Sequence, residues 1–347
     1  MIFWYLLILI VSLVNIKVCR EGFFPDYLGK EQCNAVKGVF ILLVFLGHIL
    51  MYIKRCGFVF DQQIDKAAQA FHIGMGQLVV ALFFFYSGYG VMKSFMAKGD
   101  FYLGTYPRKR LLTTLLNFDV AVFCFVLLAW IMGEEIGFPR ILLSFIGWES
   151  VGNSNWYIFV ILCCYLAFYV VFKVFGSRYR LGTAILALVA LIGMLVLYVF
   201  KPTYWYTTLL VFPSGVAYAL YSEKLEHLIQ KKFWLSIIIL LAAFLLLGLL
   251  MKTHPMHGLT FNAKAIVFAL LIVTLTMKVR IGNQWLRWCG FSLFPLYIYQ
   301  RLPMISLRGI AGDEWICAHP PVFIGICFLV TVGIALLYNK CLRINLS

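Results

Sequence analysis

The feature that most constrains this chain is its succession of long apolar segments, which short polar stretches separate. A helix that crosses a bilayer needs about 20 predominantly apolar residues. Eleven segments approach that length: Ile2–Ile16, Val36–Ile53, Phe71–Met92, Leu111–Met132, Asn155–Phe175, Gly182–Phe200, Tyr204–Tyr221, Phe233–Met251, Ala263–Met277, Gly290–Leu307 and Pro321–Tyr338. Because the hydrocarbon core offers no water to exposed backbone groups, such segments must be helical. The sequence therefore predicts an all-α, polytopic integral membrane bundle.

Composition excludes the soluble classes of protein. Of the 347 residues, 63% are hydrophobic and 12% are charged, whereas about 25% of the residues of soluble domains are charged. The net charge of +15 therefore indicates a membrane protein with basic loops, and we expect no nucleic-acid partner. The ten cysteines are scattered without a CxxC spacing, so we expect no metal site. Only Cys56 and Cys317 could meet on an oxidising face.

The basic residues predict how the chain is oriented in the membrane. If the eleven segments alternate in direction, 20 of the 29 lysines and arginines fall on one face. The positive-inside rule makes that face cytoplasmic, so the N-terminus lies outside and the C-terminus inside. Residues 1–20 lack a basic region before their apolar run. We therefore expect an extra N-terminal transmembrane segment there rather than a cleaved signal peptide.

Three ionisable residues stand out within the predicted spans, namely His48, Asp119 and Arg301. Such groups are costly in lipid and are functional candidates by default. Lys37 precedes His48 by eleven residues, which places both side chains on one stripe of a helix about 16 Å apart along its axis. A cation at the cytoplasmic lip and an imidazole near mid-bilayer suit a long ligand that lies along the helix. The alternative is a snorkelling lysine and a histidine satisfied by a neighbour.

Two further features lie at the predicted cytoplasmic ends of spans. Ser87, Gly88 and Gly90 follow an aromatic run, and such small residues permit close approach of a ligand or of a neighbouring helix. Arg108, Lys109 and Arg110 follow in the next loop. They could clamp phosphates, although a basic stop at a helix end is the commoner explanation.

Five stretches, in this order, resemble motifs of the acyltransferase-3 family of membrane proteins. The first carries a basic residue, ten others and a histidine; the others are an aromatic-serine-glycine motif, a basic motif, a tryptophan-led segment and a late glycine-serine-tyrosine helix. They are Asn34 to His48, Phe83 to Tyr89, Arg108 to Arg110, Asn155 to Ile158 and Trp288 to Gln300. Two positions depart from the family: Lys37 stands where arginine is typical, and Gln300 stands where many members have histidine.

The resemblance implies a fold and an activity. It implies a ten-helix acyltransferase core over residues 28–340, in a bacterial inner membrane. The implied reaction is O-acyl transfer, usually of acetyl, from cytoplasmic acyl-coenzyme A to a hydroxyl of a cell-envelope carbohydrate. His48 would then act as general base, and Lys37, Ser87, Gly88 and the three basic residues 108–110 would bind acyl-coenzyme A, with no metal.

The resemblance also suggests roles on the outer side. Glu149, Asn153, Asn155 and Trp156 would contact the sugar, whereas the residues alone favour an ordinary polar loop. Arg301 would stabilise a developing oxyanion or pair with Asp119, which could instead orient His48. Two other functions stay open on the residues alone: a secondary transporter of a small polar or anionic solute, and a structural subunit.

Overall fold

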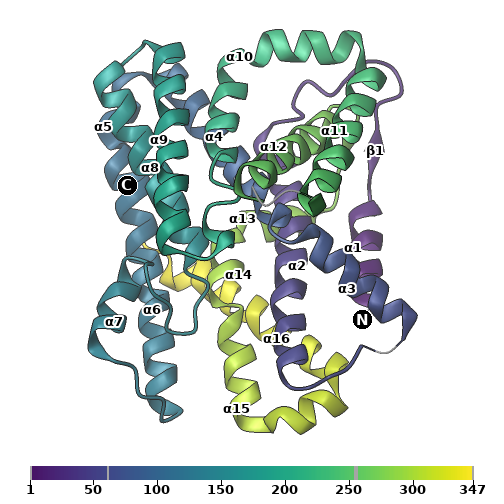
Figure 1. Ribbon diagram of the computed structural model, residues 1–347, viewed down its shortest axis with the longest axis vertical. Helices are drawn as coiled ribbons and strands as arrows, with labels where there is room; N and C mark the ends of the chain where they lie inside the picture. The colour runs from purple at the N-terminus through teal and green to yellow at the C-terminus, as the bar shows by residue number, and fades with distance from the viewer. Residues whose placement is uncertain (1, 61, 254–256, 346–347) are drawn as a thin grey trace.

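The computed structural model describes residues 2–60, 62–253 and 257–345. The chain folds into a bundle of helices joined by short connections (Figure 1). The elements are α1 (Ile2–Leu13), β1 (Lys17–Val18), α2 (Lys30–Arg55), α3 (Gln63–Met75), α4 (Leu78–Lys98), α5 (Asp100–Tyr106), η1 (Pro107–Leu112), α6 (Thr113–Ile131), α7 (Phe138–Phe145), α8 (Trp156–Phe175), α9 (Tyr179–Phe200), η2 (Thr203–Trp205), α10 (Val211–Lys231), α11 (Phe233–Thr253), α12 (His257–Thr276), β2 (Val279–Arg280), α13 (Gln284–Phe291), α14 (Leu293–Tyr299), α15 (Arg301–Ala318), α16 (Pro320–Leu337) and η3 (Tyr338–Leu342).

The predicted fold class is confirmed. Among the described residues, eight helical segments are long and apolar enough to cross a membrane. The helix α1 is apolar but shorter, with 12 residues. The exposed surface of the outer helices is rich in leucine and isoleucine, which is the surface that lipid tails solvate. The chain is therefore an integral membrane helical bundle.

Two predicted spans are broken where the sequence predicted one continuous helix. The span Phe71–Met92 is divided between α3 and α4 at Gly76, whose φ is +42°. The span Gly290–Leu307 is divided among α13, α14 and α15 at Ser292 and Gln300. Glycine adopts the conformation of Gly76 without the steric penalty that a Cβ imposes. Hydropathy reports only that a segment is apolar, so it did not reveal the breaks.

The core is assembled around α2, which runs through the centre of the bundle (Figure 1). Glycines bring its neighbours into backbone contact. A Cβ at Gly290 of α13 would lie 1.8 Å from the carbonyl oxygen of Asn34 on α2, and one at Gly88 of α4 would lie 2.1 Å from that of Phe212 on α10. Such contacts exclude any larger residue, which is how small residues fix helix crossings in membrane proteins. The position of α2 relative to α13 is thereby set.

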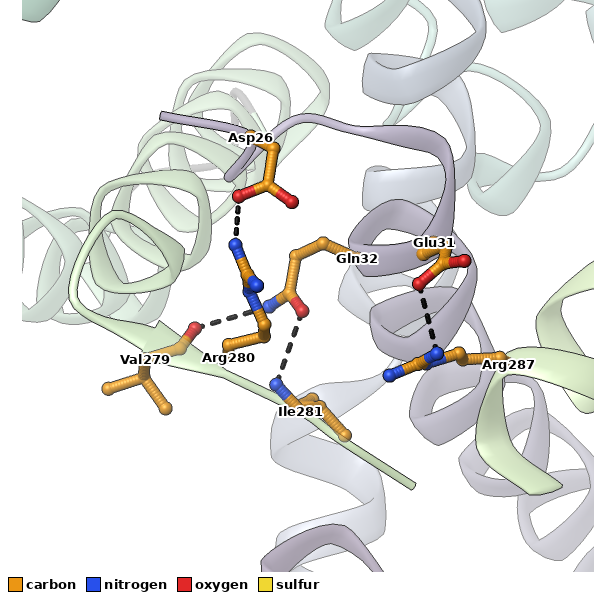
Figure 2. A network of polar contacts seen from close by, with 7 residues as sticks. All are labelled: Asp26, Glu31, Gln32, Val279, Arg280, Ile281 and Arg287. Carbon is orange, nitrogen blue, oxygen red and sulfur yellow. Dashed lines mark hydrogen bonds and ion pairs between the residues drawn. The ribbon is translucent and has the colours of Figure 1, made fainter. Parts of the chain in front are cut away.

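Polar contacts fasten the start of α2 to the segment that precedes α13 (Figure 2). The Gln32 side chain donates to the carbonyl of Val279 and accepts from the amide of Ile281, both at 3.2 Å. Arg287 pairs with Glu31 at 2.9 Å, and Asp26 pairs with an arginine of β2. The two-stranded pairing of β1 with β2 adds the chain that follows α1 to the same junction. One end of α2 is thus anchored independently of its lipid-facing surface.

Candidate active site

A cavity of about 450 Å³, the His48 cavity, lies between α2, α4 and α15. The helix α2 contributes Val44 and His48, one turn apart on a single face. Its remaining wall comes from the polar loop before α8 and from α14 and α15: Asn153, Asn155, Trp156, Tyr297 and Arg301. The structure therefore gathers residues that are more than 250 positions apart in the chain around one histidine.

Buried polar atoms without a protein partner concentrate at this cavity. Among the described residues, His48 Nδ1, Asn153 Nδ2, Ser154 Oγ and Tyr297 Oη are buried, line the cavity and make no hydrogen bond of regular geometry, although Gln300 lies near His48 and Ser154 near Tyr297. Gln300 Oε1, next to Arg301, shares that state. Buried polar groups are normally paired, so each exception calls for an explanation. A polar ligand that fills the cavity would supply the missing partners.

Arg301 is held at the edge of the same cavity by two elements. Its Nε donates to the Tyr52 hydroxyl of α2, and its Nη1 donates to the main-chain carbonyl of Asn153, each at 3.2 Å. The guanidinium also lies 5.5 Å from the Tyr52 ring centroid. Asp119 is not among its partners, and Asp119 Oδ1 makes no hydrogen bond to any described residue. The possible pairing of Arg301 with Asp119 is therefore not formed.

The loop between α7 and α8 is stiffened by its own side chains. Asn153 Oδ1 accepts from the amide of Val151 at 3.1 Å, and Ser150 donates to the Asn153 carbonyl at 2.7 Å. Asn155 Nδ2 donates to the Gly147 carbonyl at 2.8 Å. The side-chain oxygen of Asn153 is therefore hydrogen-bonded within the loop, whereas its amide nitrogen remains unpaired at the cavity. The loop presents preformed donors rather than a mobile surface.

Glu149 belongs to the same loop but does not line the His48 cavity. Its carboxylate pairs at 3.3 Å with Lys201, whose ammonium also donates to the Trp148 carbonyl at 2.7 Å. That ammonium lies 3.9 Å from the Trp148 ring centroid and 4.6 Å from that of Trp205. The structure therefore places Glu149 in a contact that supports the loop, away from the position expected for a sugar ligand.

A second cavity of about 280 Å³, the basic cavity, lies nearer the other end of the bundle. Its cations are Lys109 and Arg110 of η1 and Arg343 near the C-terminal end of the described chain. Ser87 of α4 also lines it, together with tyrosines of α8. The turn η1 is a π-helix between α5 and α6, and such wide turns frequently occur at functional sites.

Lys109 and Arg110 also line a neighbouring cavity of about 290 Å³, to which Lys98 adds a third cation. Asn117 holds the C-terminal segment against the basic cavity, because its side chain pairs with the main chain of Ile344 through both of its polar atoms, at 2.9 and 3.0 Å. The result is a pair of adjoining basic hollows with two shared cations.

The remaining residues expected at this end lie elsewhere. Arg108 lines neither basic hollow. Lys37 is half-buried on α2, within electrostatic range of Arg110, and lines neither the His48 cavity nor the basic cavity. Gly88 faces the backbone of α10. Gly88 therefore serves close packing of two helices, which was the alternative to close approach of a ligand.

Two tyrosines separate the cavities. Tyr297 of α14 lines both the His48 cavity and the basic cavity, whereas Tyr157 of α8 lines only the basic one. Their rings meet edge to face with centroids 5.2 Å apart. On its other side, the Tyr297 ring lies 6.2 Å from the imidazole of His48. We call this pair the tyrosine partition.

His72 of α3 is a residue to which the sequence assigned no role. It lines the His48 cavity, and its ring packs on Gly47, where a Cβ would lie 2.7 Å from its Cε1 atom. The missing side chain at position 47, directly before His48, is the only sequence signal that could have indicated the contact. Tyr297 lies within the glycine-serine-tyrosine motif, but the sequence does not show which cavity it lines.

Among the residues that the structure describes, no group of three or more histidine, cysteine or acidic side chains is placed to hold a metal ion. The model of one protein family, described as an acyltransferase domain, matches residues 31–340 of the chain. It is the model of the acyltransferase-3 family. No curated protein and no solved structure gives a significant match.

Proposed function

The chain belongs to the acyltransferase-3 family, whose members are acyltransferases, and from this premise we propose which groups it transfers and where. The proposed donor is cytoplasmic acyl-coenzyme A, with acetyl as the first acyl group to test. The proposed acceptor is a hydroxyl of a cell-envelope carbohydrate. The proposed setting is a bacterial inner membrane, with the basic cavity toward the cytoplasm, because most of the lysines and arginines lie in the loops of that face.

The basic hollows support a donor site. Coenzyme A is a long molecule with several phosphate charges, and arginine and lysine bind phosphates through charge-assisted hydrogen bonds. Lys109, Arg110 and Arg343 would bind these phosphates, with Lys98 in the adjoining hollow. The pantetheine arm would extend past Ser87 toward the tyrosine partition. Lys37 would act on the phosphates through its charge, from beside Arg110.

The His48 cavity supports an acceptor site, and its unpaired polar atoms are the observation that carries the proposal. A sugar offers several hydroxyls that donate and accept hydrogen bonds, which is what His48, Asn153 and Ser154 lack. The indole of Trp156 offers a flat apolar face beside them. Few convergent polar groups in a largely apolar cavity are typical of small-ligand sites.

The proposed chemistry is direct transfer. His48 accepts the proton of the acceptor hydroxyl, and the hydroxyl oxygen attacks the thioester carbonyl carbon. Arg301, fixed by Tyr52 and Asn153, stabilises the negative charge that develops on the carbonyl oxygen. The carbon–sulfur bond then breaks, and the thiolate takes the proton from His48. The products are an ester and coenzyme A.

Binding of coenzyme A to the purified protein tests the donor site. We expect Arg110→Ala and Arg343→Ala to weaken binding, and raised salt to weaken it further, because the contacts are ionic. Arg108→Ala is the matched control, since it removes an equal charge from the same turn outside both hollows. A folded wild type that binds no coenzyme A would overturn the proposal, as would equal losses at positions 108 and 110.

A further inference from the structure

The tyrosine partition has a consequence for the proposed function, on which the following inference rests. His48 lines one cavity, the cations line the other, and Tyr297 is a wall of both. The rings of Tyr157 and Tyr297 are 6% and 2% exposed. An acyl group that travels from the basic cavity to His48 must therefore pass Tyr297. The side chain that fills this passage determines what can go through it.

The two rings of the partition are held unequally. Tyr157 is braced by α4, with the Phe84 and Phe83 ring centroids at 4.9 and 6.1 Å. Ser154 lies near the Tyr297 hydroxyl without regular hydrogen-bond geometry, and Tyr297 belongs to the seven-residue helix α14. Packing and this weak contact hold its ring. Tyr297 is therefore the member of the pair that can yield.

We infer that the Tyr297 ring is the gate and acyl-length selector of this enzyme: it lets a short acyl group reach His48 and keeps water in the His48 cavity from the thioester. A water beside a general base would otherwise attack the thioester. That side reaction forms a carbon–oxygen bond from water, breaks the carbon–sulfur bond and yields a free acid and coenzyme A. Exclusion of water from a reactive group is a recognised function of closed sites.

The test measures release of free coenzyme A, without added acceptor, from acetyl-, butyryl- and hexanoyl-coenzyme A by chromatography. We expect Tyr297→Ala to raise this hydrolysis several-fold. The wild-type preference for acetyl over butyryl should be about 10-fold or more, since added methylenes in a tight pocket are worth that much, and it should approach parity in the variant. Tyr297→Phe keeps the ring and should keep the wild-type preference for acetyl in this acceptor-free assay.

Tyr299→Ala is the matched control, because Tyr299 is a buried tyrosine of the same helix and lines neither cavity. Coenzyme A binding reports folding for every variant, and Tyr297→Leu replaces Tyr297→Ala if the latter does not fold. A variant that binds coenzyme A normally but keeps wild-type hydrolysis and chain preference overturns the gate. Loss of the acetyl preference in Tyr297→Phe would overturn it too, by assigning the selection to the hydroxyl. If the wild type binds no coenzyme A, the donor site itself fails instead.

Discussion

Replacement of Gly290 by alanine should destabilise the bundle through one identifiable contact. The added Cβ would lie 1.8 Å from the Asn34 carbonyl oxygen, and side-chain carbons keep at least about 3.0 Å from such atoms, so α2 and α13 must separate by roughly 1.2 Å. Overpacking of this kind costs about 1–3 kcal/mol. We expect the upper end, because the atoms that the Cβ would meet all belong to the Asn34 backbone. Alanine regains up to about 1 kcal/mol of helix propensity, which leaves a net loss of about 2 kcal/mol.

The matched control is Gly333→Ala on α16, where an added Cβ meets nothing within 4 Å. Only the propensity gain applies there, so the free energy of unfolding should stay level or rise by up to about 1 kcal/mol. Thermal unfolding in detergent measures both, and Tm should fall by roughly 4 °C for Gly290→Ala on the usual scale. Equal Tm shifts in the two variants would show that the contact between α13 and α2 at Gly290 is not the cause of the destabilisation. Transfer activity should fall with Gly290→Ala alone, since α2 carries His48.

Three further outcomes follow from the geometry. Lys201→Met should destabilise the loop before α8 by about 2–3 kcal/mol, which is the value of lost hydrogen bonds to a charged group. Glu149→Gln should leave the KM for the acceptor almost unchanged. A large increase in that KM would show that the Glu149 carboxylate contacts the acceptor. Arg301→Lys keeps the charge but not the planar fork, so single-turnover transfer should fall by roughly 10²-fold with coenzyme A binding intact, and a wild-type rate would contradict the oxyanion role. Burial and then a hydrogen-bonded carboxylate raise the pKa of the Cys56 thiol to about 11. Its alkylation should therefore speed up about tenfold per pH unit between pH 8 and 10, because the thiolate is the reactive form. The measurement uses Cys317→Ser, which removes from the signal the neighbouring thiol that donates to the Cys56 carbonyl at 3.0 Å, and a flat pH profile would contradict the shift.

The apolar runs predicted most of the helices because lipid imposes both length and composition. The prediction for Asn155–Phe175 differs from α8 by a single residue at its start. Breaks were not predictable in this way, because one glycine scarcely changes the average hydropathy of a 20-residue window. Gly76 has positive φ where α3 ends, and the breaks at Ser292 and Gln300 involve no glycine. The helices were thus predictable from the sequence, whereas the breaks within them were not.

The site was predictable to the extent that one helix carries it. Periodicity placed Lys37 and His48 on one stripe of α2, and this stripe does run into the His48 cavity at Val44. The partners of Arg301 could not be found by the same means. Depth along a helix axis is readable from sequence, but the direction that a side chain faces around a neighbouring helix is not. Asp119 has a suitable depth, yet Tyr52 and Asn153 are the groups in reach.

The proposed base and cation owe their relative position to two helices rather than to loops. The helix α13 is packed tightly on α2 at Gly290. It ends before Ser292, whose hydroxyl accepts a hydrogen bond from Asn339 at 2.7 Å. Beyond that break, Tyr297 of α14 and Arg301 of α15 both line the His48 cavity. The bond from Arg301 to Tyr52 closes the other end of this arrangement on α2 itself. With anchors on both sides of His48, its distance to Arg301 should be insensitive to side-chain changes in the loop that faces the acceptor, provided that the Asn153 carbonyl still accepts from Arg301.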